Sequence, residues 1–248
     1  MQAFFVILHS KFNTMKKTTL AIIALVILAS CGKDPLTINT ETLNLKGKVK
    51  SITDKQIQSV HDSEWNTEQD TSIKTPYSII TRVFNEKGYW ISSETKLSTG
   101  VTISKEEVTF SEDGNYSGSK IFSGNDDLIY ENKAISFTKE LLEIESYNKA
   151  NEKISTTHSE YKEGKPVLQL MKLITNEISI ETRYSYDENG DEKELTRVSV
   201  MNGTEKTETV SVKYMERDEQ GNWLKKIYYD PKSNDNKCVV VEREIEYY

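Results

Sequence analysis

Carboxylates are the most abundant side chains in this sequence that could do acid–base chemistry, with 39 Asp and Glu against 32 Lys and Arg. Two carboxylates that flank a glycosidic bond can hydrolyse it. Such a pair could come from the adjacent Glu106 and Glu107, or from Glu242, Glu244 and Glu246. The second group alternates with apolar residues, which is typical of the solvated face of a strand. We therefore expect no catalytic pair, and a hydrolase of surface glycans is only a third alternative for the function.

Residues for metal or nucleophilic chemistry are scarce. The histidines are His9, His61 and His158, and no two of them have the spacing of zinc ligands. The sequence has no Gly-x-Ser-x-Gly elbow, phosphate loop or dinucleotide fingerprint. We expect no enzymatic activity, no metal and no cofactor.

The segment "DENGDE" starts at Asp187 and superficially resembles the beginning of a calcium loop. A calcium loop has glycine at its sixth position, whereas here Gly190 stands at the fourth. The spacing favours a hairpin turn.

A cysteine follows a long apolar run near the start of the chain. Met15-Lys16-Lys17 is basic, Leu20 to Leu28 is apolar, and Ala29-Ser30 are small, so residues 1–30 are predicted to be an export signal, with 1–14 a mis-called start. The order Leu28-Ala29-Ser30-Cys31 resembles the bacterial lipobox. The resemblance implies cleavage before Cys31, acylation of its thiol, and a lipidated tether over residues 31–42 that anchors an outer-membrane lipoprotein, either periplasmic or surface-facing.

The whole chain is acidic, with a formal net charge of −7, and this charge disfavours nucleic acid as a partner. If Cys31 carries lipid, Cys238 has no partner for an intramolecular disulfide. Cys238 lies in the strand-like run "KCVVVE" and is interpreted as a packed apolar residue.

Alternation of apolar and polar residues predicts antiparallel strands throughout residues 43–248. In "VVVEREIEYY", the residues Val239, Val241, Ile245 and Tyr247 share one face, and Arg243 is the odd member of that apolar row. "FTKELLEIESYNKANEK", which also partly fits a helix, is predicted to be a strand. We expect an all-β fold, an antiparallel meander of repeated hairpins that forms a single twisted or rolled sheet in one domain.

A glycine-containing polar cluster recurs between the predicted strands. The copies are "FNEKGYW", "FSEDGNY", "YKEGKPV", "YDENGDE" and "RDEQGNW", and their glycines are 26, 50, 26 and 31 residues apart. The gap of 50 suggests one degenerate copy, such as "YNKANEK". Glycine accepts the positive φ of a tight turn, and the flanking aromatic residues can pair across the two strands.

"YSYDENGDEKEL" and "MERDEQGNWLKKIYYD" resemble the tyrosine-aspartate, or RHS-like, repeats. Together with the lipobox and the opening "LNLKGKVKSIT", they make the chain similar to small lipoproteins of Bacteroidota. The resemblance implies no activity and transfers no functional residue.

Three function classes follow. The first is an envelope lipoprotein that serves as a non-enzymatic binding or assembly module for another envelope protein. The second is a carrier of a lipid or other apolar ligand, and the third is the hydrolase. For the first class, Trp65, Tyr247 and Tyr248 are the candidate partner contacts, because Trp65 lies in a polar segment and the two tyrosines end a strand that we expect at a free sheet edge. For Trp65, covering one end of the sheet is the simpler alternative.

Overall fold

The computed structural model describes residues 40, 43–69, 77–112, 115–138, 140–174, 177–233 and 236–248. The predicted export signal, the lipobox with Cys31 and nearly all of the predicted tether lie outside the described residues. No helix in the described part of the chain is both long and apolar enough to cross a membrane.

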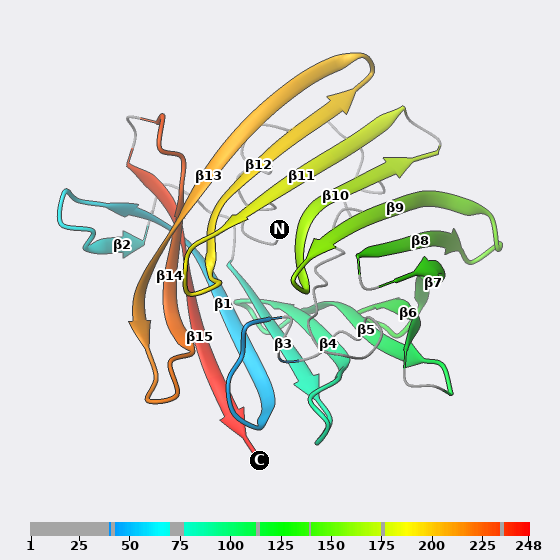
Figure 1. The fold of residues 1–248 in the computed structure, drawn as a ribbon, viewed down its shortest axis with the longest axis horizontal. Helices are drawn as coiled ribbons and strands as arrows, with labels where there is room; N and C mark the ends of the chain where they lie inside the picture. The colour runs from blue at the N-terminus through cyan, green and yellow to red at the C-terminus, as the bar shows by residue number, and fades with distance from the viewer. Residues whose placement is uncertain are drawn as a thin grey trace.

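Fourteen antiparallel strands close into a β-barrel, and one further short strand, β2, pairs only with β1 (Figure 1). The prediction of an all-β antiparallel fold is confirmed. The strands are β1 (Val49–His61), β2 (Thr67–Gln69), β3 (Ser78–Phe84), β4 (Trp90–Leu97), β5 (Thr102–Phe110), β6 (Tyr116–Ser123), β7 (Leu128–Phe137), β8 (Leu141–Asn148), β9 (Lys153–Lys162), β10 (Lys165–Leu173), β11 (Ile178–Tyr186), β12 (Glu192–Met201), β13 (Thr204–Arg217), β14 (Trp223–Tyr229) and β15 (Lys237–Tyr247).

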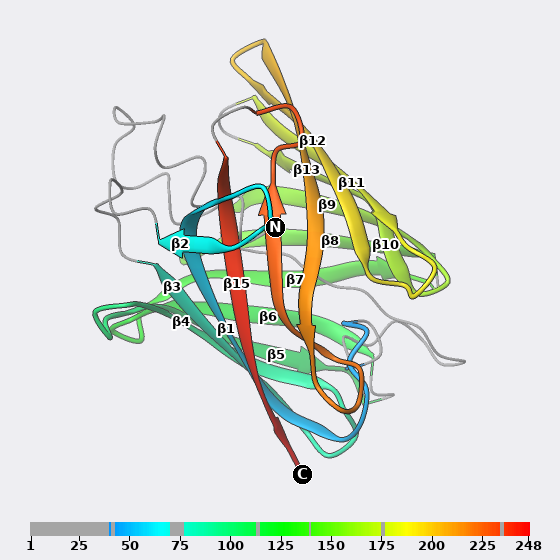
Figure 2. The same ribbon diagram turned by 90° about the vertical axis from the view of Figure 1, so that its left-hand side faces the viewer.

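The expectation of a single twisted or rolled sheet with free edges is wrong, because the first and last strands pair with each other. β1 and β15 run antiparallel from Val49 opposite Tyr247 to Val60 opposite Lys237, and they lie side by side in Figure 2. Their lengths match closely, at 13 and 11 residues, so nearly every backbone group along this seam can find a partner. Closure removes the two edges that an open meander would leave exposed.

The barrel has two ends with different turns. We call end A the one where β1 begins and β15 ends, and end B the opposite one. All five glycine-containing repeats connect strands at end A, where odd-numbered strands from β3 to β13 lead into even-numbered ones. The sixth end-A connection lies between Phe137 and Leu141, so the degenerate copy belongs there. "YNKANEK" turns at end B, and its assignment as the missing copy is wrong.

The end-A turns confirm the predicted turn geometry and aromatic pairs. At the β11–β12 turn, Gly190 donates its N–H to the carbonyl of Asp187 and has a φ of 79°. Phe84 lies opposite Trp90, and Phe110 lies opposite Tyr116, each pair beside a local shift in strand register. These shifts are β-bulges, which increase the twist that a closed barrel needs.

Apolar residues from several strands meet inside the barrel at end A. Leu45, from the segment before β1, packs in one cluster with residues of β1, β3, β4, β6, β8 and β9. Because these strands are not all neighbours, their side chains can converge only on the inner face of the wall. The buried members are Leu45, Val49, Ile52, Phe84, Trp90, Tyr116, Leu142, Ile144 and Tyr161.

The outer face of the wall is charged. Ion pairs between neighbouring outward side chains recur around the barrel, as between Lys50 and Glu246 at 2.6 Å and between Lys153 and Glu145 at 2.8 Å. Glu242 and Glu244 also face outward, as the alternation of β15 predicts, opposite Lys55 and Thr53 of β1. Exposed apolar side chains such as Ile103 and Ile135 lie among these charges, whereas a membrane-spanning barrel has a continuous apolar band facing the lipid.

Candidate functional site

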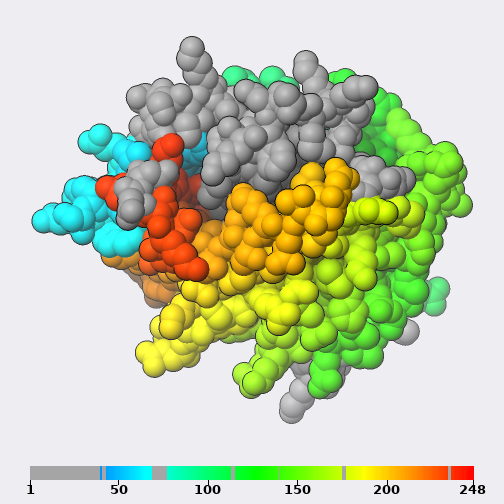
Figure 3. Space-filling model, turned by 90° about the horizontal axis from the view of Figure 1, so that it is seen from above, coloured from blue at the N-terminus to red at the C-terminus, as the bar shows by residue number. Residues whose placement is uncertain are grey.

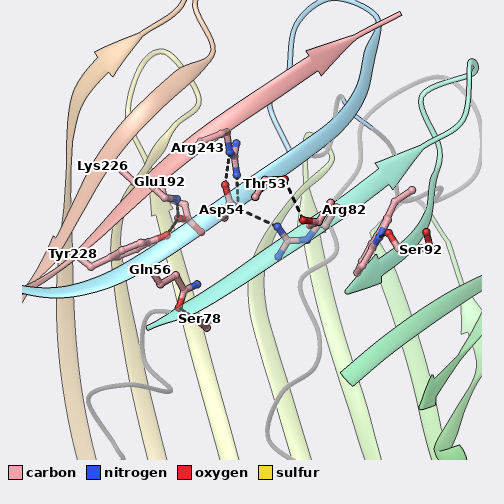
Figure 4. Close-up of polar contacts among 12 residues, drawn as sticks. Thr53, Asp54, Gln56, Ser78, Arg82, Ser92, Glu192, Lys226, Tyr228 and Arg243 are labelled. Carbon is pink, nitrogen blue, oxygen red and sulfur yellow. Dashed lines mark hydrogen bonds and ion pairs between the residues drawn. The ribbon is translucent and has the colours of Figure 1, made fainter. Parts of the chain in front are cut away.

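A buried cluster of charged side chains occupies the inner wall beside the closing seam. Asp54 of β1 lies between Arg243 of β15 and Arg82 of β3 (Figure 4). Arg243 donates from Nε to Oδ1 at 2.7 Å and from Nη2 to Oδ2 at 2.9 Å, and Arg82 donates from Nη1 to Oδ2 at 3.0 Å. The carboxylate of Asp54 therefore connects three strands across the seam. We call these three residues the seam triad.

A second ion pair lies close to the seam triad on the same face. Lys226 of β14 is 3.2 Å from the carboxylate of Glu192, and the hydroxyl of Tyr228 donates to the same carboxylate oxygen at 3.0 Å. The centroid of the Trp223 ring lies 3.5 Å from the guanidinium carbon of Arg243 and 4.4 Å from the ammonium nitrogen of Lys226. The aromatic ring thus contributes cation–π contacts to two buried cations.

Burial and pairing set the charge states of these groups. Burial alone would raise the pKa of Asp54, but the charge and hydrogen bonds of Arg243, together with Arg82, hold that pKa below its ordinary value. Burial likewise raises the pKa of Glu192, while the charge of Lys226 and the hydrogen bonds from Tyr228 and Lys226 lower it. Burial also lowers the pKa of Lys226. Each carboxylate here has a cation beside it, so the negative charges of the cluster are balanced by its own cations.

Glu106 of β5 is a buried carboxyl whose neighbours stabilise its charged form only in part. Its side chain lies on the inner face, next to Ser93 on β4, whose hydroxyl is 3.4 Å from Oε2. Burial raises the pKa of Glu106 to about 7, and hydrogen bonding from Ser119 and the charge of Arg82 offset only part of this effect. The hydroxyl of Tyr130, also buried on this face, has no hydrogen-bond partner.

The wall does not place these carboxyls as a glycosidase would. Glu106 and Glu107 point to opposite faces of β5, so they cannot act together on one substrate. Glu106 lies in register with Ile52 across β3 and β4, and three strand spacings are about 14 Å along the wall. Asp54 lies two residues from Ile52, so its backbone is about 14 Å or more from that of Glu106 along the wall, whereas the two carboxyl groups of a glycosidase are about 5–10 Å apart.

The other sequence candidates lie in turns or on the outer face. Asp187 accepts the backbone N–H groups of Asn189 and Asp191 at 2.9 Å each, so "DENGDE" is a hairpin turn. His158 lies on the outside between Glu143 and Glu160. The part of the chain that the structure describes contains no group of three or more His, Cys, Asp or Glu side chains that could hold a metal ion.

The segment from Leu43 to Lys48 crosses end A and is fixed there by polar contacts. We call it the end-A clasp. Asn222, in the β13–β14 turn, accepts the N–H of Lys46 at 2.7 Å and donates to its carbonyl at 2.9 Å. Asn44 donates to Asp191 at 2.8 Å. At Gly47, a Cβ would lie 1.9 Å from the side-chain oxygen of Gln220, so the clasp fits closely against the turn.

The strand that ends in Tyr247 and Tyr248 has no free edge, so the expectation of partner docking by strand addition there is wrong. β15 pairs with β14 on one side and β1 on the other. The hydroxyl of Tyr247 contacts Asp218 and Asn222, and that of Tyr248 donates to the carbonyl of Phe84 at 2.7 Å. Both tyrosines thus hold end A together; a partner contact through their exposed atoms stays a prediction.

Trp65 lies in the β1–β2 hairpin and covers part of the outer face at end B. Its ring stacks on His61 with a centroid distance of 4.3 Å, meets Tyr229 at 4.7 Å, and has the ammonium of Lys213 at 4.3 Å. It packs against a cluster of Ile227, Cys238 and Val240. This matches the simpler alternative for Trp65, while a contact with a partner stays a prediction. Cys238 is buried there as expected, and burial raises the pKa of its thiol to about 11.

Trp65 has a φ of 67°, in a turn of the type that uses Gly88, Gly190 or Gly221 elsewhere. Because that conformation costs a bulky residue about 1–2 kcal/mol, the ring packing must offset it. We expect Trp65→Ala and Trp65→Gly both to destabilise the protein in urea unfolding and to speed the reaction of Cys238 with a thiol reagent. The glycine variant should retain about 1 kcal/mol more stability than the alanine variant.

Asn151→Gly is the matched control, because Asn151 has a φ of 58° in an equivalent turn at end B but covers no apolar cluster. It should leave both the unfolding midpoint and the Cys238 reaction nearly unchanged. Equal losses for the alanine and glycine variants would show that the turn conformation contributes nothing to the cost.

No protein-family model matches this chain, and no curated protein matches its sequence. Among solved structures, it is similar to a porin-like protein from Bacteroides uniformis, with 10% identity and a TM-score of 0.44 over 80% of this chain and 98% of that one. It is also similar to TcdB2-TccC3, with 12% identity and a TM-score of 0.19 over 75% of this chain, which spans only 11% of that chain. These likenesses are distant, and we draw nothing about function from them.

Proposed function

We propose that the protein is a lipid-anchored, non-enzymatic binding or assembly module of the outer-membrane envelope, with its barrel in the aqueous phase. The charged outer face carries this proposal. Lysine and glutamate pairs such as Lys153 with Glu145 lie where a membrane-embedded barrel would need apolar side chains. Such a barrel needs a separate attachment to a membrane, which an acyl group on Cys31 would supply.

The inner wall supports a polar rather than an apolar ligand or partner. Farther from end A than the apolar cluster, buried polar side chains on adjacent strands form hydrogen bonds with one another. Asn132 donates to Ser119 at 3.0 Å, and Ser146 donates to Asn132 at 2.7 Å. Gln169 of β10 and Thr182 of β11 are a second set of buried polar neighbours, in register with Ser159 of β9. A carrier of lipid would need large apolar side chains at these positions. The alternatives of an apolar carrier and a glycan hydrolase therefore have less support.

The test compares the full-length protein with Cys31→Ala in membranes isolated from expressing cells. We expect the wild-type protein to sediment with the membranes and to carry acyl groups on Cys31 by mass spectrometry. The Cys31→Ala variant should remain in the aqueous fraction after the membranes are removed. A variant that stays embedded in the bilayer without its acyl group would overturn the proposal.

Chemical crosslinking in the same membranes tests the binding role. A protein crosslinked in stoichiometric amount to the wild-type chain and absent with Cys31→Ala is the expected result. Lipid retained by the purified barrel in native mass spectrometry would instead support the apolar carrier.

A further inference from the structure

The tether joins the barrel at one end, and this position has a consequence for how the barrel lies on a membrane. Thr40 donates its N–H to the carbonyl of Gly88 in the β3–β4 turn at 2.9 Å, and the N–H of Leu45 donates to the carbonyl of Thr40 at 2.8 Å. The β3–β4 turn belongs to end A. Thr40 and the end-A clasp are therefore both held at end A, where β1 begins.

The length between the anchor and this fixed point is short. Thr40 lies nine residues after Cys31 in the sequence. Nine residues reach at most about 30 Å when fully extended.

The height of the barrel is close to the greatest reach of those nine residues. A strand of 10 residues such as β9 is about 33 Å long, and the usual tilt of barrel strands gives a height of about 25 Å. With end B against the lipid, end A and Thr40 would lie about 25 Å or more from the surface, and the tether would have to be almost fully extended. With end A toward the lipid, Thr40 lies near the surface and no such extension is needed.

From this geometry, and resting on the proposed lipid anchor, we infer that the barrel stands with end A toward the lipid surface and presents end B to the surroundings. The end-A turns do not enter the bilayer, because they carry exposed carboxylates such as Glu86, Glu163 and Glu219. End B then faces away from the membrane. Three of its hairpins, β1–β2, β12–β13 and β14–β15, lie on the face seen in Figure 3.

The orientation is testable with one fluorophore at either end of the same strand. Glu188→Cys places an exposed label in the end-A turn before β12, and Thr204→Cys places one just after β12 at end B. Cys238 is buried, so the otherwise unmodified lipoprotein is the control for background labelling. Each acylated variant is reconstituted into phosphatidylcholine vesicles that contain a headgroup nitroxide quencher.

We expect the label at position 188 to lose most of its fluorescence and the label at position 204 to keep most of it. Equal quenching, or stronger quenching at position 204, would overturn the orientation. Inserting twenty Gly/Ser residues after Gly32 lengthens the tether beyond the height of the barrel, so the difference between the two labels should then disappear. Failure of the acylated protein to float with the vesicles would instead refute the lipid anchor on which the orientation rests.

Discussion

Replacing Asp54 by alanine is expected to destabilise the barrel by about 3–5 kcal/mol, because the change leaves Arg243 and Arg82 buried without their shared carboxylate. All three side chains of the seam triad are almost fully buried, with exposed fractions of 6–7%. Solvent therefore cannot replace the lost partner. The shift of the urea unfolding midpoint, followed by tryptophan fluorescence, measures the loss.

Glu244→Ala is the matched control, since Glu244 faces outward on β15, opposite Thr53, one residue along β1 from Asp54. It should shift the midpoint very little. If Asp54→Ala fails to fold, the triple variant Asp54→Leu, Arg82→Met, Arg243→Met tests the same argument, because removing all three charges together removes the unpaired cations. The comparator is then Asp54→Asn, which removes only the carboxylate charge and keeps both arginines. A triple variant less stable than Asp54→Asn would show that the ion pairs themselves stabilise the seam.

Glu106→Gln should make the protein more stable than the wild type at pH 8 and leave it similar at pH 5. The folded-state pKa of Glu106 is raised to about 7 from an ordinary value of 4.5. A carboxyl with a raised pKa contributes stability that is fully present below the unfolded pKa and is lost as the pH rises through the folded value. Between pH 4.5 and about 7, the wild type should lose about 3 kcal/mol that the variant retains.

The comparison with Glu107→Gln isolates the effect of burial. Glu107 neighbours Glu106 but lies exposed on the outer face of β5, so its substitution should leave the pH dependence of the wild type intact. Unfolding curves in urea at several pH values from 5 to 8 provide the measurement. A parallel pH dependence for the wild type and Glu106→Gln would contradict the proposed ionisation of Glu106.

The strands and turns were predictable from the sequence because local patterns determine them. Alternation along β15 separated the inner row with Val239 and Val241 from the outer row with Glu242 and Glu244, and the structure places the rows on those faces. The repeated glycine turns follow from the need for positive φ, which any sequence with the same turn must meet. The aromatic pairs beside the turns are also local, since their partners are six residues apart.

Closure of the barrel was not predictable by the same means. It depends on pairing between β1 and β15, which are almost the whole described chain apart, and local periodicity carries no information about such a partner. Arg243 was one feature of the sequence that pointed to a distant buried partner for β15. A charged residue in an otherwise apolar row indicates a buried partner of opposite charge, and Asp54 is its register partner on β1. The burial of Glu106 was missed for a similar reason, because a Glu-Glu pair gives no indication of which member faces inward.

The pairing of the first and last strands also constrains when the protein can fold. β1 cannot gain its second full-length neighbour until β15, the last strand in chain order, has been synthesised. Until then, β1 keeps one side open to pairing with other chains, which is a route to aggregation. Seam formation is also a contact of high sequence separation, which slows folding. Closure is thus a late step of assembly, because it needs both the first and the last strand of the barrel.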